Sequence, residues 1–122
     1  MVNESKQSIF VVDDDQGILD SFDAMLGDDY PLTLMDSGKE ALQVIAESRP
    51  ELLFLDIKMP GMNGLEVLQW MWENKVSTKV VIVTALPQDR NEEIARQYGV
   101  YRYLKKPFDV NEIEDIAKTV LH

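Results

Sequence analysis

Five short apolar runs, spaced so that a helix fits between each pair, constrain the fold of this sequence more than any other feature. They predict strands at Ile9–Val12, Leu32–Met35, Leu52–Leu55, Val80–Val83 and Val100–Leu104. The first, third and fourth runs consist almost entirely of Val, Ile, Leu and Phe, without polar alternation. Such runs are typical of strands that are covered on both faces in a parallel sheet.

Segments with a helical spacing of apolar residues lie between and after these runs. The first ends at Gly27, which we expect to form a left-handed C-terminal cap. The third presents an apolar stripe that includes Met71 and Trp72, whereas Trp70 falls opposite it and is expected at the surface, with its ring flat on the helix. The last is expected to start at Asp109, a helix N-cap.

The resulting pattern is a strand followed by a helix, repeated five times without an obvious linker or sequence repeat. Because crossovers between parallel strands are right-handed, this order predicts an α/β fold with a doubly wound, five-stranded parallel sheet. We expect residues 1–122 to form one domain, since the chain is too short for a second.

Composition excludes several functional classes. The 22 acidic and 12 basic residues give a net charge of −10, which disfavours direct contact with nucleic acid. The chain contains no cysteine, so disulfides, thiolate metal sites and cysteine nucleophiles are excluded. The polar opening segment does not resemble a targeting signal, and no apolar stretch reaches the ~20 residues that a membrane span requires. We therefore expect a cytoplasmic protein without membrane contact.

Polar residues follow four of the predicted strands. The first strand leads into Asp13–Asp15, the third into Asp56, the fourth into Thr84 and the fifth into Lys106. Each has an ordinary alternative role, such as a helix cap, a strand former or a solvated charge. In doubly wound sheets, however, function collects at the carboxyl ends of the strands, and several carboxylates in one cleft favour a cation such as Mg²⁺.

The segment from Asp56 to Gly64 identifies a family. It resembles the phosphoacceptor strand and loop of response-regulator receiver domains, in which an Asp is followed by Met-Pro three residues later and by Gly eight residues later. The resemblance extends to Asp13-Asp14, to Thr84-Ala85 and to Lys106-Pro107-Phe108, in the same order and at similar intervals. It implies a flavodoxin-like fold, (βα)5, with strand order 2-1-3-4-5.

The resemblance also implies residue roles. Asp56 would accept a phosphoryl group from a sensor histidine kinase, a phosphotransfer protein or a small phosphodonor. Asp13, Asp14 and Asp56 would hold Mg²⁺ together with the backbone carbonyl of Lys58. Lys106 would meet a phosphate oxygen. The protein would assist its own phosphorylation and dephosphorylation without being a turnover enzyme.

The switch to an active state would start at Thr84, whose hydroxyl binds the new phosphoryl oxygens. Tyr103 would move inward with it, although an ordinary edge-strand aromatic is the alternative for this residue. Strand alternation sends Lys105 and Lys106 to opposite faces of the sheet, so only one of them can reach the site. We assign Lys106 to the site because it directly precedes Pro107. The resemblance implies a cis peptide bond between Lys106 and Pro107. The fourth helix, fifth strand and fifth helix would then contact a downstream protein or output domain.

Two other classes remain open. Asp13–Asp15 after an apolar strand is also similar to the nucleophile loop of haloacid-dehalogenase-type phosphatases, but the short chain and the Met-Pro-Gly-Met-Asn-Gly loop argue against that class. A receiver-like binding module that is never phosphorylated is the third reading, weakened because every expected site residue is present. The sequence does not name the kinase or the output, nor does it decide between a stand-alone receiver and part of a longer regulator.

Overall fold

Five parallel strands and five helices alternate along the chain in the computed structural model, which describes residues 8–87 and 90–121. The strands are β1 (Ile9–Val12), β2 (Leu32–Met35), β3 (Leu52–Leu55), β4 (Lys79–Thr84) and β5 (Arg102–Lys105). The helices are α1 (Gln16–Leu26), α2 (Gly38–Glu47), α3 (Gly64–Glu73), α4 (Arg90–Gln97) and α5 (Val110–Val120). The first seven residues of the predicted domain lie outside the described ranges, as does the opening segment considered for a targeting signal.

The strands form one sheet in the order β2-β1-β3-β4-β5, and all neighbouring pairs are parallel. This confirms the predicted doubly wound sheet and its strand order. Three strands begin and end at the predicted residues: β1, β2 and β3. No helix in the described part of the chain is both long enough and apolar enough to cross a membrane.

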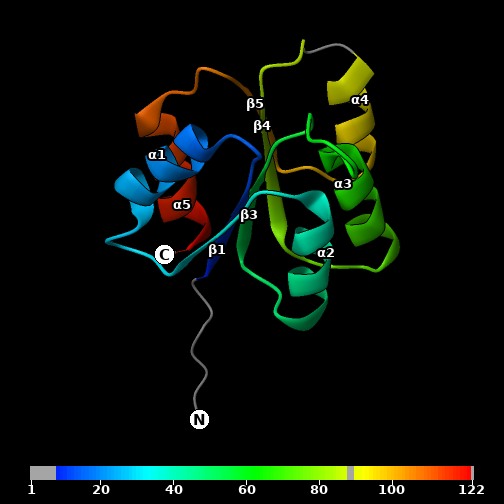
Figure 1. Cartoon of the computed structure of the whole chain (residues 1–122), viewed down its shortest axis with the longest axis horizontal. Coiled ribbons are helices and arrows are strands. Elements are labelled where there is room, and N and C mark those ends of the chain that lie inside the picture. The colour runs from blue at the N-terminus through cyan, green and yellow to red at the C-terminus, as the bar shows by residue number, and fades with distance from the viewer. Residues whose placement is uncertain (1–7, 88–89, 122) are drawn as a thin grey trace.

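Helices cover both faces of the sheet, α1 and α5 on one side and α2, α3 and α4 on the other (Figure 1). The side chains of each strand alternate between the two resulting cores. In β1, for example, Phe10 and Val12 pack toward α2–α4, whereas Ile9 and Val11 pack toward α1 and α5. Burial on both faces explains why the central strands lack polar alternation.

The predicted bounds of the fifth strand are wrong at its start. The strand begins at Arg102 and not at Val100. The N–H group of Val100 donates to the carbonyl oxygen of Ala95 at the end of α4, and Gly99 has a φ of 77°. These two residues therefore terminate the helix, and the first sheet-type bond on this side runs from the Tyr101 N–H to the Val80 carbonyl oxygen.

Gly27 does not form the predicted left-handed cap. Its φ is −63°, in the right-handed region, and its N–H donates to the carbonyl oxygen of Asp23. The chain continues into a further turn, in which the N–H groups of Asp29 and Tyr30 both donate to the carbonyl oxygen of Leu26. The carbonyl groups at the end of α1 are thus satisfied without a left-handed residue.

The expected positions of the two tryptophans in α3 are reversed. Trp70 is half-buried and packs against the core on the α2–α4 side, whereas Trp72 is 56% exposed. The buried stripe of α3 is centred on Gly64, Val67, Leu68 and Met71. At 100° per residue both tryptophans lie on flanks of this stripe, so the neighbouring elements decide which of them is covered.

Candidate functional site

The carboxyl ends of β1 and β3 place two carboxylates side by side. The N–H group of Asp13 donates to the carbonyl oxygen of Met35 at the end of β2, and that of Asp56 donates to the carbonyl oxygen of Val12 at the end of β1. These bonds continue the ladders of the sheet by one residue. Asp13 and Asp56 therefore occupy fixed positions at one edge of the sheet, as predicted for the strand ends.

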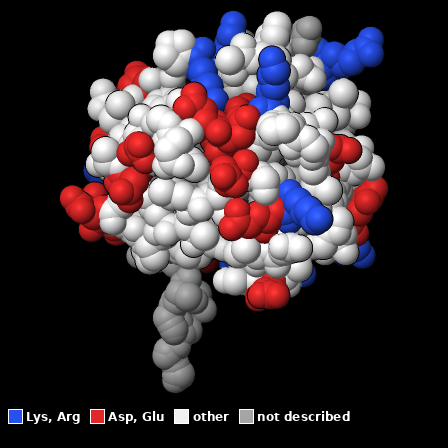
Figure 2. Space-filling view, in the orientation of Figure 1, with Lys and Arg blue, Asp and Glu red and all other residues white. Residues whose placement is uncertain are grey.

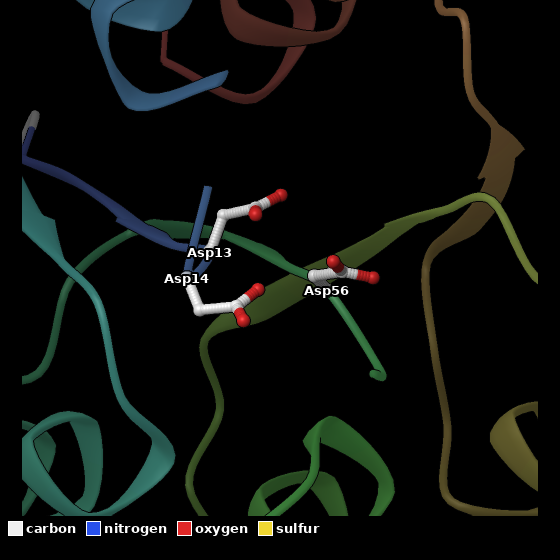
Figure 3. Close-up of side chains that lie close together, drawn as sticks. All are labelled: Asp13, Asp14 and Asp56. Carbon is white, nitrogen blue, oxygen red and sulfur yellow. The ribbon is translucent and has the colours of Figure 1, made fainter. Parts of the chain in front are cut away.

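Asp14 joins this pair, and the three side chains project toward a common space (Figure 3). One carboxylate oxygen from each residue lies within 4.8 Å of the others. Asp13 and Asp56 are buried, with 2% and 6% of their surface exposed, whereas Asp14 is open to solvent. A compact set of oxygen donors with one open side fits a hard cation such as Mg²⁺, which keeps several of its water ligands.

Lys106 supplies the positive charge of the site. Its Nζ atom donates to Oδ2 of Asp13 at 2.8 Å and to Oδ2 of Asp56 at 3.1 Å. Its backbone N–H donates to the carbonyl oxygen of Thr84, and the bond between Lys106 and Pro107 is cis, as the resemblance implies. The neighbouring Lys105 has an exposed side chain.

For Asp13 and for Lys106 alike, burial and hydrogen bonding shift the pKa in opposite directions. The pKa of Asp13 is raised above its ordinary value, because the cost of burying its charge and the repulsion by Asp56 outweigh the hydrogen bonds from Lys106 and from the Asp15 backbone. The pKa of Lys106 is also raised, because its bonds to two carboxylates outweigh the cost of burial. The two directions agree physically, since one ammonium group is shared by two carboxylates and neutralises neither fully.

Backbone N–H groups hold the carboxylates in orientation. The N–H of Ile57 donates to Oδ1 of Asp56 at 2.7 Å, and that of Asp15 donates to Oδ1 of Asp13 at 2.9 Å. Asp15 itself is the N-cap of α1, so the ordinary role considered for a strand-end Asp applies to this residue. Each buried carboxylate therefore has one oxygen fixed by the backbone and the other in contact with Lys106.

Gly64 brings α3 against the backbone of Asp56. A Cβ atom at this position would lie 2.0 Å from the carbonyl oxygen of Asp56, a distance that only the absence of a side chain permits. The N–H of Gly64 donates to the carbonyl oxygen of Ile57, and Asn63 and Glu66 form a capping box at the start of the helix. The loop after β3 is thereby fixed from its C-terminal end.

A pocket of about 280 Å³ opens above these groups, and its lining contains all but one of the predicted site residues: Asp13, Asp14, Asp15, Asp56, Lys58, Met59, Pro60, Thr84, Ala85, Leu86 and Lys106. Acidic side chains gather near the centre of the face shown in Figure 2, and Lys and Arg side chains border them. The side chain of Lys58 is exposed. The Thr84 hydroxyl is buried and accepts a hydrogen bond from the N–H of Leu86 at 3.3 Å.

Tyr103 is the exception, because it lies outside the pocket lining. It is buried in the core on the α2–α4 side of the sheet. Its partner in the register of β4 and β5 is Ile82, two residues before Thr84. Thr84 and Tyr103 therefore share one face of adjacent strands, because side chains alternate with a period of two.

Two contributors were not predicted from the sequence. The N–H of Ile57 carries no side-chain signal and is found only from the geometry. The close approach of Gly64 to Asp56 could have been inferred from the sequence. Gly64 belongs to the loop that carries the family resemblance, and it directly follows Asn63, a residue type typical of helix N-caps.

Comparison with known proteins agrees with this geometry. The sequence model of the response regulator receiver domain matches residues 9–118. The chain belongs to the response regulator receiver family.

Receiver relatives differ in how much of their length the chain covers. It is 33% identical over 122 residues to sporulation initiation phosphotransferase F of Bacillus subtilis, covering 99% of this chain and 96% of that protein. It is 36% identical over 105 residues to the DNA-binding transcriptional regulator NtrC of Escherichia coli, covering 85% of this chain and 22% of that protein. The structure of a CheY-like receiver domain protein from Methanospirillum hungatei superposes with a TM-score of 0.89 at 29% identity, covering 96% of this chain and 94% of that one.

Proposed function

We propose that this receiver is a phosphorylation-dependent switch in which Asp56 accepts a phosphoryl group. The observation that carries the proposal is the cluster of the Asp13, Asp14 and Asp56 carboxylates, two of which share the ammonium group of Lys106. A turnover phosphatase of the haloacid-dehalogenase type is disfavoured, because the chain matches the receiver family over residues 9–118. We further propose that residues 1–122 act as one receiver domain.

The chemistry requires one nucleophilic oxygen. A carboxylate oxygen of Asp56 attacks the phosphorus atom of a phosphohistidine whose imidazole ring is protonated on its other nitrogen. The P–O bond forms, the P–N bond breaks, and the electron pair of the P–N bond leaves with the ring as neutral imidazole. The Ile57 N–H and Lys106 orient the Asp56 carboxylate before the reaction. Phosphoryl transfer depends mainly on such positioning and on charge neutralisation.

Asp13, Asp14 and Asp56 would hold Mg²⁺, with the backbone carbonyl of Lys58 as a further ligand. Bound there, the ion would neutralise charge on the transferring phosphoryl oxygens. Lys106 would exchange part of its contact with the two aspartates for a contact with the phosphoryl group, which keeps the charge of the site balanced. The same groups would position water for loss of the phosphoryl group.

We infer that the signal leaves the site through Thr84 and Tyr103. A phosphoryl group on Asp56 would attract the Thr84 hydroxyl, and the space this opens on the same sheet face would favour a shift of Tyr103 and α4. Such a change is a population shift driven by contacts that exist only in the phosphorylated state. The proposed partners are a histidine kinase or phosphotransfer protein and a downstream protein or output domain on the α4-β5-α5 face.

Binding of beryllofluoride, a phosphoryl mimic, tests the site. We expect binding to the wild-type chain only with Mg²⁺, and its loss in Asp56→Asn. Asp15→Asn is the matched control, because it removes one carboxylate from the same pocket but keeps the helix cap. Binding without Mg²⁺, or equal loss in the two variants, would contradict the proposed assignment.

A further inference from the structure

A second pocket lies at the opposite edge of the sheet from Asp56, between the C-terminal ends of α3 and α4 and the starts of β4 and β5. Its volume is about 370 Å³. Its walls are mainly aromatic and aliphatic and include Trp72, Val76, Tyr98, Val100 and Tyr101. We call it the α3/α4 groove; none of the residues that line it belongs to the proposed phosphorylation site.

Trp72 is the most unusual member of this groove. It is more than half exposed, yet its position is defined, because its ring lies 6.5 Å from that of Tyr98 and packs over Gly99. A Cβ atom at Gly99 would approach the Trp72 ring to 3.1 Å, so the glycine at the end of α4 leaves just enough room for it. Tryptophan is among the residue types enriched at binding hot spots, and this one is exposed at a pocket lined mainly by aromatic and aliphatic side chains.

Charge at the groove contrasts with that of the whole chain. Within the described ranges no carboxylate lines the groove, although the chain carries a net charge of −10. Lys79 Nζ lies 5.8 Å from the centre of the Tyr101 ring, and Arg102 Cζ lies 5.4 Å from it. Neither cation forms a salt bridge with a carboxylate of the described residues.

The two cations are not equivalent. Arg102 borders a hollow with three carboxylates, those of Asp109, Glu112 and Asp115, and does not line the groove. Lys79 also borders a second hollow, but the one carboxylate there, from Glu51, is accompanied by the cation Arg49. Lys79 is the cation that lines the groove itself. An anionic group of a ligand would therefore be recognised at Lys79.

We propose that the α3/α4 groove is a docking site for a segment of another protein that presents a large apolar side chain beside one or more carboxylates. The apolar side chain fills the space bounded by Trp72, Tyr98 and Val100, and a carboxylate pairs with Lys79. A protein segment fits better than a small ligand, because Trp and Tyr, which line the groove, are residue types enriched in protein interfaces. The groove shares no lining residue with the pocket at Asp56 and adds a second contact surface to the receiver.

A short blocked peptide, acetyl-Asp-Asp-Leu-Phe-Asp-Asp-amide, serves as the probe, with amide and indole NMR shifts of the full chain as the readout. Two control peptides replace either Leu-Phe by Ser-Ser or every Asp by Lys. The acidic apolar peptide is expected to shift the signals of Trp72, Tyr98 and Gly99. The Ser-Ser and Lys peptides are expected to bind at least about fivefold more weakly, since apolar burial and charge pairing both contribute.

Matched variants distinguish peptide binding at the groove from nonspecific binding to the rest of the surface. Trp72→Ala is expected to weaken binding roughly tenfold or more, as at other tryptophan hot spots. Lys79→Glu is expected to weaken it roughly three- to tenfold, because an attraction becomes a repulsion. Lys39→Glu changes the net charge equally on the exposed surface of α2 and is expected to leave the affinity unchanged. The Lys79→Glu result keeps the test valid if Trp72→Ala is poorly folded.

Three results would overturn the proposal. One is equal weakening by Lys79→Glu and Lys39→Glu, and another is a set of shifts that clusters away from the groove. The third is a concentration-dependent shift of the groove signals in the chain alone that Trp72→Ala abolishes, because a second copy of the chain would then be the occupant.

Discussion

The Nζ atom of Lys106 lies 2.8 Å from Oδ2 of Asp13, across 93 residues of sequence. The same atom bonds Asp56, so a single ammonium group serves as counter-ion for two buried carboxylates, while Asp14 adds a third carboxylate nearby. With all four groups ionised the cluster carries three negative charges and one positive charge, a net of −2. This imbalance underlies the first two predictions.

Stability without metal should depend on the ionisation of Asp13. Its pKa is raised above the ordinary value of 3.8, so just above that value the folded protein holds a proton that the unfolded chain has lost. Stability contributed by Asp13 therefore decreases as the pH rises through this window. The pKa of Lys106 is raised above 10.5, so its contribution is lost only at still higher pH and stays constant across the window.

Thermal melting of wild type and Asp13→Asn, both in a chelator, measures this effect between about pH 4 and pH 7. The Asn variant mimics the uncharged carboxyl, so the melting temperature of the variant should rise relative to that of wild type as the pH increases. If the melting temperature of wild type rises relative to that of the variant instead, the attraction between Asp13 and Lys106 outweighs the cost of burying the Asp13 charge.

Mg²⁺ should stabilise the chain, and Asp14 should control how much. At ten times its dissociation constant the ion would add about 1.4 kcal/mol, or a melting shift of about 3–6 °C. Asp14→Asn should raise the melting temperature of the metal-free protein, because one repelling charge is removed, and should reduce the Mg²⁺ increment. Asp15→Asn should retain the increment. A less stable Asp14→Asn variant with the full increment would show that Asp14 has a structural role outside the metal site.

Gly64→Ala should damage both the fold and the site. Its Cβ would meet the carbonyl oxygen of Asp56 at 2.0 Å, so the loop after β3 must shift, at a cost of about 1–3 kcal/mol. Gly17→Ala is the contrasting substitution, because Gly17 lies in the exposed first turn of α1, where its Cβ would meet only a side-chain oxygen of Asp15. That variant should be near neutral or slightly stabilised. Chemical denaturation measures both, and a Gly64→Ala variant as stable as wild type would show that the contact is easily relieved.

Thr84→Ala should uncouple the site from the α4-β5-α5 face. In wild type, beryllofluoride and Mg²⁺ are expected to shift amide signals in α4, β5 and α5, including those of Tyr103 and Lys105. In Thr84→Ala the shifts should be confined to the neighbourhood of Asp56. Thr78→Ala removes the same kind of hydroxyl at the other end of β4, where it donates to the carbonyl oxygen of Pro50, and should leave the pattern unchanged. Distant shifts that persist in Thr84→Ala would exclude this residue as the link.

The strands were predictable because burial on both faces leaves an uninterrupted apolar signal, as in Leu52–Leu55. Two features that were predicted incorrectly depend on contacts around the end of α4. The Trp72 ring lies against Gly99 at the end of α4, and the start of β5 is delayed because the Val100 N–H is bonded to Ala95. Neither contact is encoded in the local pattern of apolar residues.

Placement of the site followed from topology, because parallel strands bring their carboxyl ends to one edge. The joint position of Asp13, Asp56 and Lys106 could thus be expected from the sequence. The bond from the Ile57 N–H to Asp56 could not, since every residue carries the same backbone donor and only the loop geometry directs it.

Intact mass spectrometry after incubation with acetyl phosphate, followed by mapping of the modified residue, measures whether Asp56 is the phosphoryl acceptor. With Mg²⁺ present, we expect one added phosphoryl group per chain, located on Asp56. We expect none in a chelator and none in Asp56→Asn, while Asp15→Asn should be labelled like wild type. A phosphoryl group that maps to any other residue, or that persists in Asp56→Asn, would show that Asp56 is not the acceptor.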